Sequence, residues 1–288
     1  MARGLDHIVH AVHDLDAAAA LYRRLGFTVG ARNRHPWGTH NCIVQLPGFF
    51  VELLAVVEPE NIPPPRPGAF SFGDFARGFL AHGQGLAMLV LESSDALSDR
   101  EAFRRADIGD YELFRFEREG KRPDGAPVRV GFSLAFAHDP KAPDVGYFVC
   151  QQHHPENFWN PAFQQHANTV CAIEGVVLVA ENPTDHHIFL SAFAGERELS
   201  ATSTGVTVST PRGSIQVMDP ASFRIHYDLE PPDVSGGATL AALRFRVRNR
   251  EIARATLRQA HIAAPERMSR IIVDPSVAMG ATLVFEPV

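Results

Sequence analysis

The sequence contains few cysteines and no long uninterrupted apolar run. Its three cysteines, Cys42, Cys150 and Cys171, are an odd number without CxxC spacing, which argues against a disulfide scaffold and fits a reducing compartment. The longest apolar runs, such as Phe49–Val57, are short and interrupted by charge, so we expect no segment to span a membrane. Residues 1–13 lack the charged-then-apolar order of a signal peptide, and we therefore expect a cytoplasmic protein.

Positive charge and the common catalytic motifs are also scarce. Lys and Arg number 27 against 33 Asp and Glu, for a net charge of -6, and no basic run offers a footprint for nucleic acid. GxSxG, P-loop and HExxH motifs are absent, and the GxGxxG pattern begun by Gly83 and Gly85 fails at Met88. These absences disfavour acyl transfer, nucleotide hydrolysis and dinucleotide binding. The 288 residues, 45% of them apolar, suffice for two globular domains.

The sequence does contain a fourfold repeat, in which a short apolar strand leads through a polar cap into a helix. The predicted strands are His7–His13, Leu86–Leu91, Val176–Ala180 and Leu240–Val247, and the helices after them are Ala17–Leu25, Asp95–Ala106, Thr184–Phe193 and Arg250–Ala260. The predicted cap residues share a short side chain that can accept hydrogen bonds from the free amides of a first helical turn. They are Asp14, Ser94, Asn182 and Asn249.

Further strand-like segments follow each helix. They are Phe27–Arg32, His40–Gln45 and Phe49–Val57, then Tyr111–Glu117, Val128–Phe136 and Gly146–Gln152, then Gly205–Ser209, Ser214–Met218 and Ser222–Asp228, and finally Arg270–Val273 and Gly280–Phe285. The proline-rich residues 58–73 and the polar residues 153–168 are predicted connections. This rhythm indicates an α+β fold of four βαβββ modules. We expect two halves, residues 1–152 with the first two modules and residues 170–288 with the others.

The first module carries the strongest candidate for chemistry. Alternation places His7 and Val9 on one face of the opening strand, and Phe50, Glu52 and Leu54 on one face of the closing strand. A glutamate among apolar residues is costly to bury as an anion, and a cation or a histidine that shares its proton would offset this cost. Imidazole and carboxylate are also a suitable ligand pair for a divalent metal. A purely structural or solvated role for both residues is the alternative from composition alone.

Residues 5–57 resemble the vicinal-oxygen-chelate superfamily, which includes glyoxalase-like, bleomycin-resistance and dioxygenase proteins. The resemblance rests on the opening DHIVHAV-DLDAAAALYRRLGF and the closing FFVELLAV, and the segments His35–Asn41 and Cys150–Pro161 are similar to glyoxalase-like members. It implies paired modules that form curved, incomplete barrels around a cavity. It also implies a divalent metal (Zn, Mn, Ni or Fe), with His7 and Glu52 as half of its ligand set and a paired module supplying the rest.

The second half of that ligand set is not visible in the sequence. The second module carries Gly85 or Leu86 at the opening position and Cys150–Gln152 at the closing position. Several interpretations stay open: a glutamine carbonyl binds the metal, His153 or His154 swings in, or water completes the shell. The paired half could instead have lost the site. His153 is the third candidate metal ligand, although two histidines in a polar linker are also typical of exposed loop residues.

The candidate pocket residues are Trp37, Asn41, Phe50, Gln151 and Trp159. The two tryptophans lie in loops flanked by proline or glycine, where they could line a ligand pocket or fill a core or an interface. Asn41 shares a strand face with Ile43, so it could contact substrate or cap a turn. Gln151 lies at a strand end, where ordinary edge polarity is the alternative.

The resemblance implies a metal-dependent lyase or isomerase that acts on a small substrate with a carbonyl or vicinal oxygens. His7 would bind the metal, and Glu52 would bind it and exchange into the role of a base. The alternative is a metal-free protein that binds small molecules, as in resistance proteins of the same superfamily. A ring-cleaving dioxygenase is disfavoured because it requires two histidines. We expect a small-molecule ligand, no nucleic acid and no membrane partner, and a C-terminal half that is structural or forms a homodimer.

Overall fold

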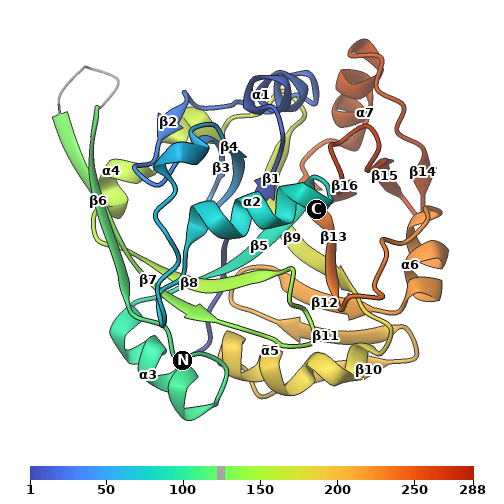
Figure 1. Cartoon of the computed structure of the whole chain (residues 1–288). Coiled ribbons are helices and arrows are strands. Elements are labelled where there is room, and N and C mark those ends of the chain that lie inside the picture. Colours follow the sequence, from blue (N-terminus) through green and yellow to red (C-terminus); the bar gives the residue numbers. More distant parts are fainter. Residues whose placement is uncertain (122–126) are drawn as a thin grey trace.

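A computed structural model describes residues 1–121 and 127–288 of the chain. It contains two curved, eight-stranded sheets with the same strand plan (Figure 1). The first runs β2-β3-β4-β1-β5-β8-β7-β6 and the second β10-β11-β12-β9-β13-β16-β15-β14. In each, two antiparallel central strands (β1 with β5, β9 with β13) are flanked by parallel partners. Each sheet is therefore a pair of βαβββ modules, and the expected α+β fold class is confirmed.

The elements of the first half begin with the module that carries the candidate site. They are β1 (Leu5–Ala11), α1 (Leu15–Arg24), β2 (Asn33–Arg34), β3 (Thr39–Leu46), β4 (Phe49–Val56), η1 (Pro59–Asn61), α2 (Phe72–His82), β5 (Gly85–Glu92), α3 (Ala96–Arg105), β6 (Phe114–Lys121), β7 (Pro127–Ala137) and β8 (Gly146–Gln152). Two short helices, α4 (Pro155–Phe158) and η2 (Pro161–Gln164), lie between β8 and β9.

The second half repeats the plan with shorter edge strands. Its elements are β9 (Val170–Val179), η3 (Pro183–His186), α5 (His187–Ala194), β10 (Leu199–Thr202), β11 (Gly205–Ser209), β12 (Ser214–Met218), α6 (Pro220–Tyr227), β13 (Thr239–Val247), α7 (Arg250–Gln259), β14 (Glu266–Arg267), β15 (Arg270–Val273) and β16 (Thr282–Pro287). No helix in the described part of the chain is long and apolar enough to cross a membrane.

The helix caps show how local sequence sets these boundaries. Asp14 accepts hydrogen bonds from amides of the first turn of α1, and Asn249 does the same for α7. The cap of α3 is Asp95 rather than the predicted Ser94. Asn182 precedes η3, but its side chain makes no capping bond. The predicted mechanism therefore holds at two of the four positions.

Three segments of the structure differ from the sequence-based prediction. Residues 222–228 are not a strand, because Asp219 caps a helix, α6, whose first residue is a proline. A second helix, α2, begins at the end of the proline-rich connection, where Ser71 accepts from the amide of Asp74. Residues 27–32 form no strand, and β2 is confined to Asn33–Arg34.

One continuous apolar core joins the two halves. It contains the outer faces of both sheets and the buried sides of α1, α3, α5 and α7. Phe27 of the first half packs against Phe245 and Phe285 of the second, with ring centroids 5.3 and 6.1 Å apart. The inner faces carry separate clusters: α2 covers part of the first sheet, and α6 covers the second with Phe223 and Tyr227.

Candidate functional site

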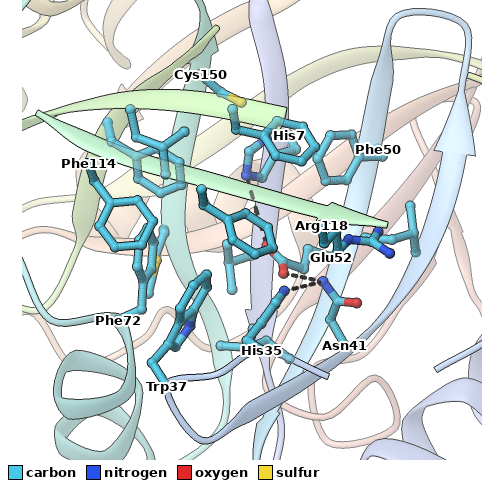
Figure 2. Close-up of a pocket in the computed structure, with 18 of the residues that line it drawn as sticks. His7, His35, Trp37, Asn41, Phe50, Glu52, Phe72, Phe114, Arg118 and Cys150 are labelled. Atoms are coloured by element: carbon cyan, nitrogen blue, oxygen red, sulfur yellow. Dashed lines mark hydrogen bonds and ion pairs between the residues drawn. The ribbon is translucent and has the colours of Figure 1, made fainter. Parts of the chain in front are cut away.

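The candidate site is a cavity of about 90 Å³ on the inner face of the first sheet (Figure 2). Its walls are mainly aromatic and come from β4, β6, β7, β8, α2, α4 and the loop between β2 and β3; they include Trp37, Phe50, Phe72, Phe114, Phe132 and Phe148. Polar side chains gather in one corner, namely His7, His35, Asn41, Glu52 and Arg118. An apolar enclosure with a few convergent polar groups is typical of a small-molecule site.

His7 and Glu52 meet because their strands are neighbours. β1 and β4 run parallel, with His7 opposite Phe50 and Val9 opposite Glu52. Alternate residues of each strand therefore face the cavity. His7 Nε2 lies 3.9 Å from Glu52 Oε2, and both side chains are largely buried. The two groups are close enough to share a proton through one bound water or one ligand atom.

A carboxylate and an aromatic ring fix the orientation of His7. Its Nδ1 lies 2.8 Å from Asp6 Oδ2, and its ring stacks on Phe50 at a centroid distance of 4.2 Å. Because a carboxylate accepts, the Nδ1 proton of a neutral His7 is directed at Asp6, which leaves Nε2 as the acceptor in the cavity. Gln152 Nε2 donates to the other oxygen of Asp6 at 3.3 Å. The imidazole is thus presented with its basic nitrogen toward Glu52.

Glu52 is oriented from the opposite side by a chain of amides. Asn41 Nδ2 donates to Glu52 Oε1 at 2.6 Å, Asn33 Nδ2 donates to Asn41 Oδ1 at 2.9 Å, and an Arg118 amino group donates to Asn33 Oδ1. His35 Nε2 lies 3.3 Å from the same Asn41 amide. Burial lowers the pKa of His35, which favours its neutral form. Burial also lowers the pKa of Arg118, and the nearby Glu52 carboxylate opposes this shift.

The position equivalent to His7 in the paired module is held by Met88. His7 lies seven residues before the helix cap Asp14, and Met88 lies seven residues before the helix cap Asp95. Met88 also lines the cavity. From the sequence alone, this position was expected at Gly85 or Leu86, two or three residues earlier in the strand.

The position equivalent to Glu52 is held by Phe148. Val9 pairs with Glu52, and Val90, its counterpart in the paired module, pairs with Phe148. Among residues 1–121 and 127–288, no cluster of three or more His, Cys, Asp or Glu side chains could hold a metal ion. Two donors fall short of the three protein ligands that are typical of a catalytic metal site. The donor set present therefore does not fit the implied divalent metal.

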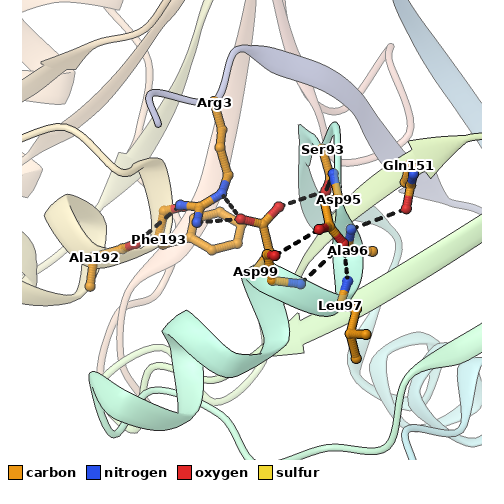
Figure 3. A network of polar contacts seen from close by, with 10 residues as sticks. Arg3, Ser93, Asp95, Ala96, Leu97, Asp99, Gln151, Ala192 and Phe193 are labelled. Atoms are coloured by element: carbon orange, nitrogen blue, oxygen red, sulfur yellow. Dashed lines mark hydrogen bonds and ion pairs between the residues drawn. The ribbon is translucent and has the colours of Figure 1, made fainter.

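Gln151 lies away from the cavity. Its Oε1 accepts from the amide of Ala96 and its Nε2 donates to the carbonyl of Ser94, so it holds the start of α3 (Figure 3). The same view shows Arg3 joining Asp99 of α3 to the last turn of α5. Gln151, near the end of β8, therefore joins this strand to the start of α3 and does not contribute to the pocket.

The remaining linker candidates also lie outside the cavity. His153 Nε2 is 2.8 Å from the Ser133 hydroxyl, and neither residue lines the cavity. His154 is partly exposed, and its Nδ1 lies 3.7 Å from Glu156 Oε1. Trp159 packs behind the wall, with its ring 5.0 Å from Phe158, which is the residue of this segment that does line the cavity. The predicted residues that the structure brings together are thus His7, Trp37, Asn41, Phe50 and Glu52.

Two polar residues of the site, His35 and Arg118, were not singled out from the sequence. A signal for Arg118 exists, since Phe114, Phe116 and Arg118 alternate along β6 and all line the cavity. His35 belongs to the segment that carried the resemblance, where only Trp37 and Asn41 were selected. His35 and Arg118 reach the polar corner because β6 and the β2–β3 loop face each other. This is a tertiary arrangement that the sequence pattern does not show.

Comparisons with known proteins agree with this architecture. The model of the family described as "Glyoxalase-like domain" matches residues 5–193. A hypothetical protein from Staphylococcus aureus is 13% identical, with a TM-score of 0.70 over 99% of this chain and 100% of that chain. A Mn(II)-bound glyoxalase from Novosphingobium aromaticivorans is 10% identical, with a TM-score of 0.56 over 100% and 83%.

A mutant of 4-hydroxymandelate synthase from Streptomyces coelicolor has a similar structure. It is 12% identical, with a TM-score of 0.53 over 100% of this chain and 93% of that chain. Identities this low show a shared fold and leave the chemistry to be argued from the site itself. No curated protein sequence matches the chain.

Proposed function

The chain belongs to the glyoxalase-like domain family, and from this premise we propose that it is a lyase or isomerase for a small carbonyl compound. The substrate is largely apolar and carries a carbonyl or two vicinal oxygens, and its chemistry is a proton transfer between carbon and oxygen. One observation carries the proposal: His7 Nε2 and Glu52 Oε2 face each other at 3.9 Å in the polar corner of an aromatic cavity.

Neighbouring side chains prepare His7 and Glu52 for acid–base chemistry. Asp6 accepts from His7 and stabilises the imidazolium that forms when Nε2 takes a proton. Asn41 donates to one oxygen of Glu52 and leaves the other facing His7. The aromatic walls keep bulk water from the reacting carbon, which strengthens the electrostatic interactions inside. Glu52 would remove the proton next to the carbonyl and pass it to Nε2 of His7, and the imidazolium formed there would return the proton to the substrate.

The proposal assigns no step to a metal. His7 and Glu52 could occupy two positions of a metal shell, and Asp6 stands where a carboxylate often orients a ligating histidine. The two remaining positions belong to Met88 and Phe148, and neither side chain suits a hard divalent cation. A divalent metal would polarise the substrate carbonyl if it were bound, and elemental analysis of protein purified without chelators measures its presence directly.

A metal-free binding or resistance protein is the second candidate. The apolar character of Met88 and Phe148 favours it, because the paired module contributes mainly apolar contact surface to the cavity and no His, Asp or Glu. In this case the polar corner would orient a ligand without transforming it. Catalysis and binding are separable by experiment, since a binding protein saturates with ligand and leaves its carbon–hydrogen bonds intact.

Solvent exchange tests the proposed chemistry. Phenacyl alcohol, an aromatic ketone with vicinal oxygens, is incubated with the protein in deuterated water, and exchange at its CH₂ group is followed by NMR. We expect catalysed exchange that falls by about 10²–10⁴-fold in His7→Ala and Glu52→Gln, while His154→Ala, a histidine outside the cavity, behaves as the wild type. Exchange that persists in both variants overturns the proposal. Saturable binding without exchange, with or without added Zn²⁺ or Mn²⁺, supports the binding protein instead.

A further inference from the structure

A second cavity, of about 230 Å³, adjoins the first and is termed here the outer pocket. It lies between the proline-rich loop of residues 63–71 and residues 112–115 at the start of β6. The backbone holds this loop against the strand, because the amide of Glu112 donates to the carbonyl of Gly68 at 2.6 Å. The outer pocket is therefore built by a fixed contact between loop and strand.

Three aromatic residues line both cavities and form the partition between them. They are Trp37, Phe72 and Phe114. The Trp37 ring stacks on Phe72 at 5.6 Å and meets Phe114 edge-on at 5.3 Å, and Phe72 and Phe114 are also 5.3 Å apart. Phe72 is the first residue of α2, Phe114 is the first residue of β6, and Trp37 lies in a loop, so each ring stands at the end of a regular element or outside one. These contacts close the partition, so a ligand that reaches both cavities displaces at least one of the three rings.

The two cavities differ in their balance of charge. The inner one holds one carboxylate, Glu52, and one guanidinium, Arg118, whereas the outer one holds Arg66, Glu112 and Arg115. Arg66 and Glu112 form an ion pair at 3.4 Å with both side chains mostly exposed, and such a pair contributes little. Arg115 has no ion pair with any described residue, so its guanidinium is available. The outer pocket thus offers one net positive charge, which suits a monoanion better than a dianion.

From this arrangement we infer that the outer pocket binds a carboxylate carried by the same ligand whose carbonyl enters the inner cavity. The inference rests on the proposed function, and it narrows the substrate class to aromatic or alkyl ketones with a carboxylate on a short chain. Arg118 offsets the charge of Glu52 in the inner cavity, whereas Arg115 leaves the outer pocket with a net positive charge, so the carboxylate of the ligand lies in the outer pocket. Arg115 is a specificity-determining residue, and its guanidinium matches a carboxylate in shape as well as charge.

Binding of a matched pair of probes tests the inference. Benzoylpropionate carries an aromatic ketone and a carboxylate, and its primary amide differs in charge alone. Titrations follow the fluorescence of Trp37 in a Trp159→Phe background, which removes the second tryptophan. We expect the anion to bind about tenfold more tightly than the amide, and Arg115→Gln to abolish this difference while the affinity for the amide changes less than about twofold. Arg105→Gln, an exposed arginine of α3, controls for net charge and should retain the preference.

Each outcome separates the two claims. Equal affinity for anion and amide in the wild type, or a preference that survives Arg115→Gln, overturns the outer carboxylate site. A preference that Arg105→Gln abolishes as well also overturns it, because it then reflects net charge. Because these titrations measure binding, they are independent of turnover. Absence of catalysed exchange in the wild type, with an intact anion preference, leaves the inference standing and refutes the proposed reaction.

Discussion

The two sheets share one strand order, yet they use their inner faces differently. The first encloses a cavity with a polar corner, whereas α6 covers the second with Phe223 and Tyr227. The residues that stand seven positions before the caps of the second half are Gly175 and Ala242. Neither can replace the imidazole of His7, so the same backbone plan is kept without the chemistry.

The charged groups of the second sheet are also satisfied internally. Arg244 pairs with Glu286 at 2.6 Å, and Arg270 reaches the same carboxylate at 3.3 Å. In the first sheet, by contrast, Glu52 and His7 face a cavity. The comparison teaches that the fold supplies position, and that the side chains of a single module decide whether the position becomes a site.

Substitution at equivalent positions is the strongest test of this contrast. Val9 pairs with Glu52, and Val177, its counterpart in the second half, pairs with Gln216. We expect Glu52→Ala to lower the exchange rate of an aromatic hydroxyketone by about 10²–10⁴-fold, and Gln216→Ala to leave it unchanged. The rate is measured by NMR, and circular dichroism verifies that both variants fold. A comparable loss in both would show that the second sheet takes part in the chemistry.

The next test compares the packing of the two inner faces, and here the larger effect is expected in the second sheet. Phe223 of α6 is fully buried, so Phe223→Ala should lower the free energy of unfolding by about 3–5 kcal/mol. Phe116 lies at the rim of the cavity and is partly exposed, so Phe116→Ala should cost less than about 2 kcal/mol. Urea denaturation measures both values. If the cavity residue proves the more costly of the two, the filled and open faces have been assigned the wrong way round.

Much of the fold could be predicted because its signals are local. Asp14 and Asn249 mark helix starts through their own side chains, and alternation places Glu52 on the correct face. The helix α6 was missed although its signals are local: Asp219 and Pro220 form its start, and Phe223 and Tyr227 lie four residues apart, as one face of a helix requires. Only the first two residues of α2 fall in the proline-rich connection, and the rest of this helix was assigned to no element.

The site was predicted in part, for the same physical reason. Strand neighbours such as His7 and Glu52 follow from the module plan, and Asn41 follows from its strand face. Arg118 and His35 reach the site through tertiary contacts between β6 and a loop, which periodicity does not record. Gln151 was placed in the pocket by its strand, but its side chain turns to the helix start instead.

The contact between the two halves at His10 should lose stability as the pH falls. His10 lies fully buried, with Nδ1 2.9 Å from the Tyr22 hydroxyl and Nε2 2.9 Å from the carbonyl of Met279 in the second half. Burial lowers the pKa of His10 to about 4. Between pH 6.5 and 4 the unfolded chain therefore binds a proton that the folded chain does not, and stability falls as the pH falls.

The expected loss from His10 is about 3 kcal/mol over that range at most. His10→Gln should flatten this part of the pH dependence, whereas His154→Gln, a change at a partly exposed histidine, should not. Urea unfolding at several pH values between 4 and 7 measures the difference in slope. Burial also lowers the pKa of His35 and His166, so some slope remains in the variant. If His10→Gln leaves the pH dependence of the unfolding free energy unchanged, the contact between the halves at His10 is insensitive to protonation.

The smallest expected effect concerns Asp6, which acts through His7 as a positioning residue. Asp6 lies eight residues before the cap Asp14, and Glu174 lies eight residues before Asn182 in the second half. Both are acids, but Asp6 accepts from an imidazole at 2.8 Å, whereas Glu174 is paired with arginines of β13.

Asp6→Asn should lower kcat by about tenfold to a hundredfold, because an amide can donate to Nδ1 and then favours the tautomer whose proton points at Glu52. KM should change little, since Asp6 does not line the cavity, and the acidic limb of the pH–rate profile should move. Glu174→Gln, the counterpart change, should alter neither. A uniform loss of stability without a change in the profile would reduce Asp6 to a structural role, and the difference between the two sheets would then rest on His7 and Glu52 alone.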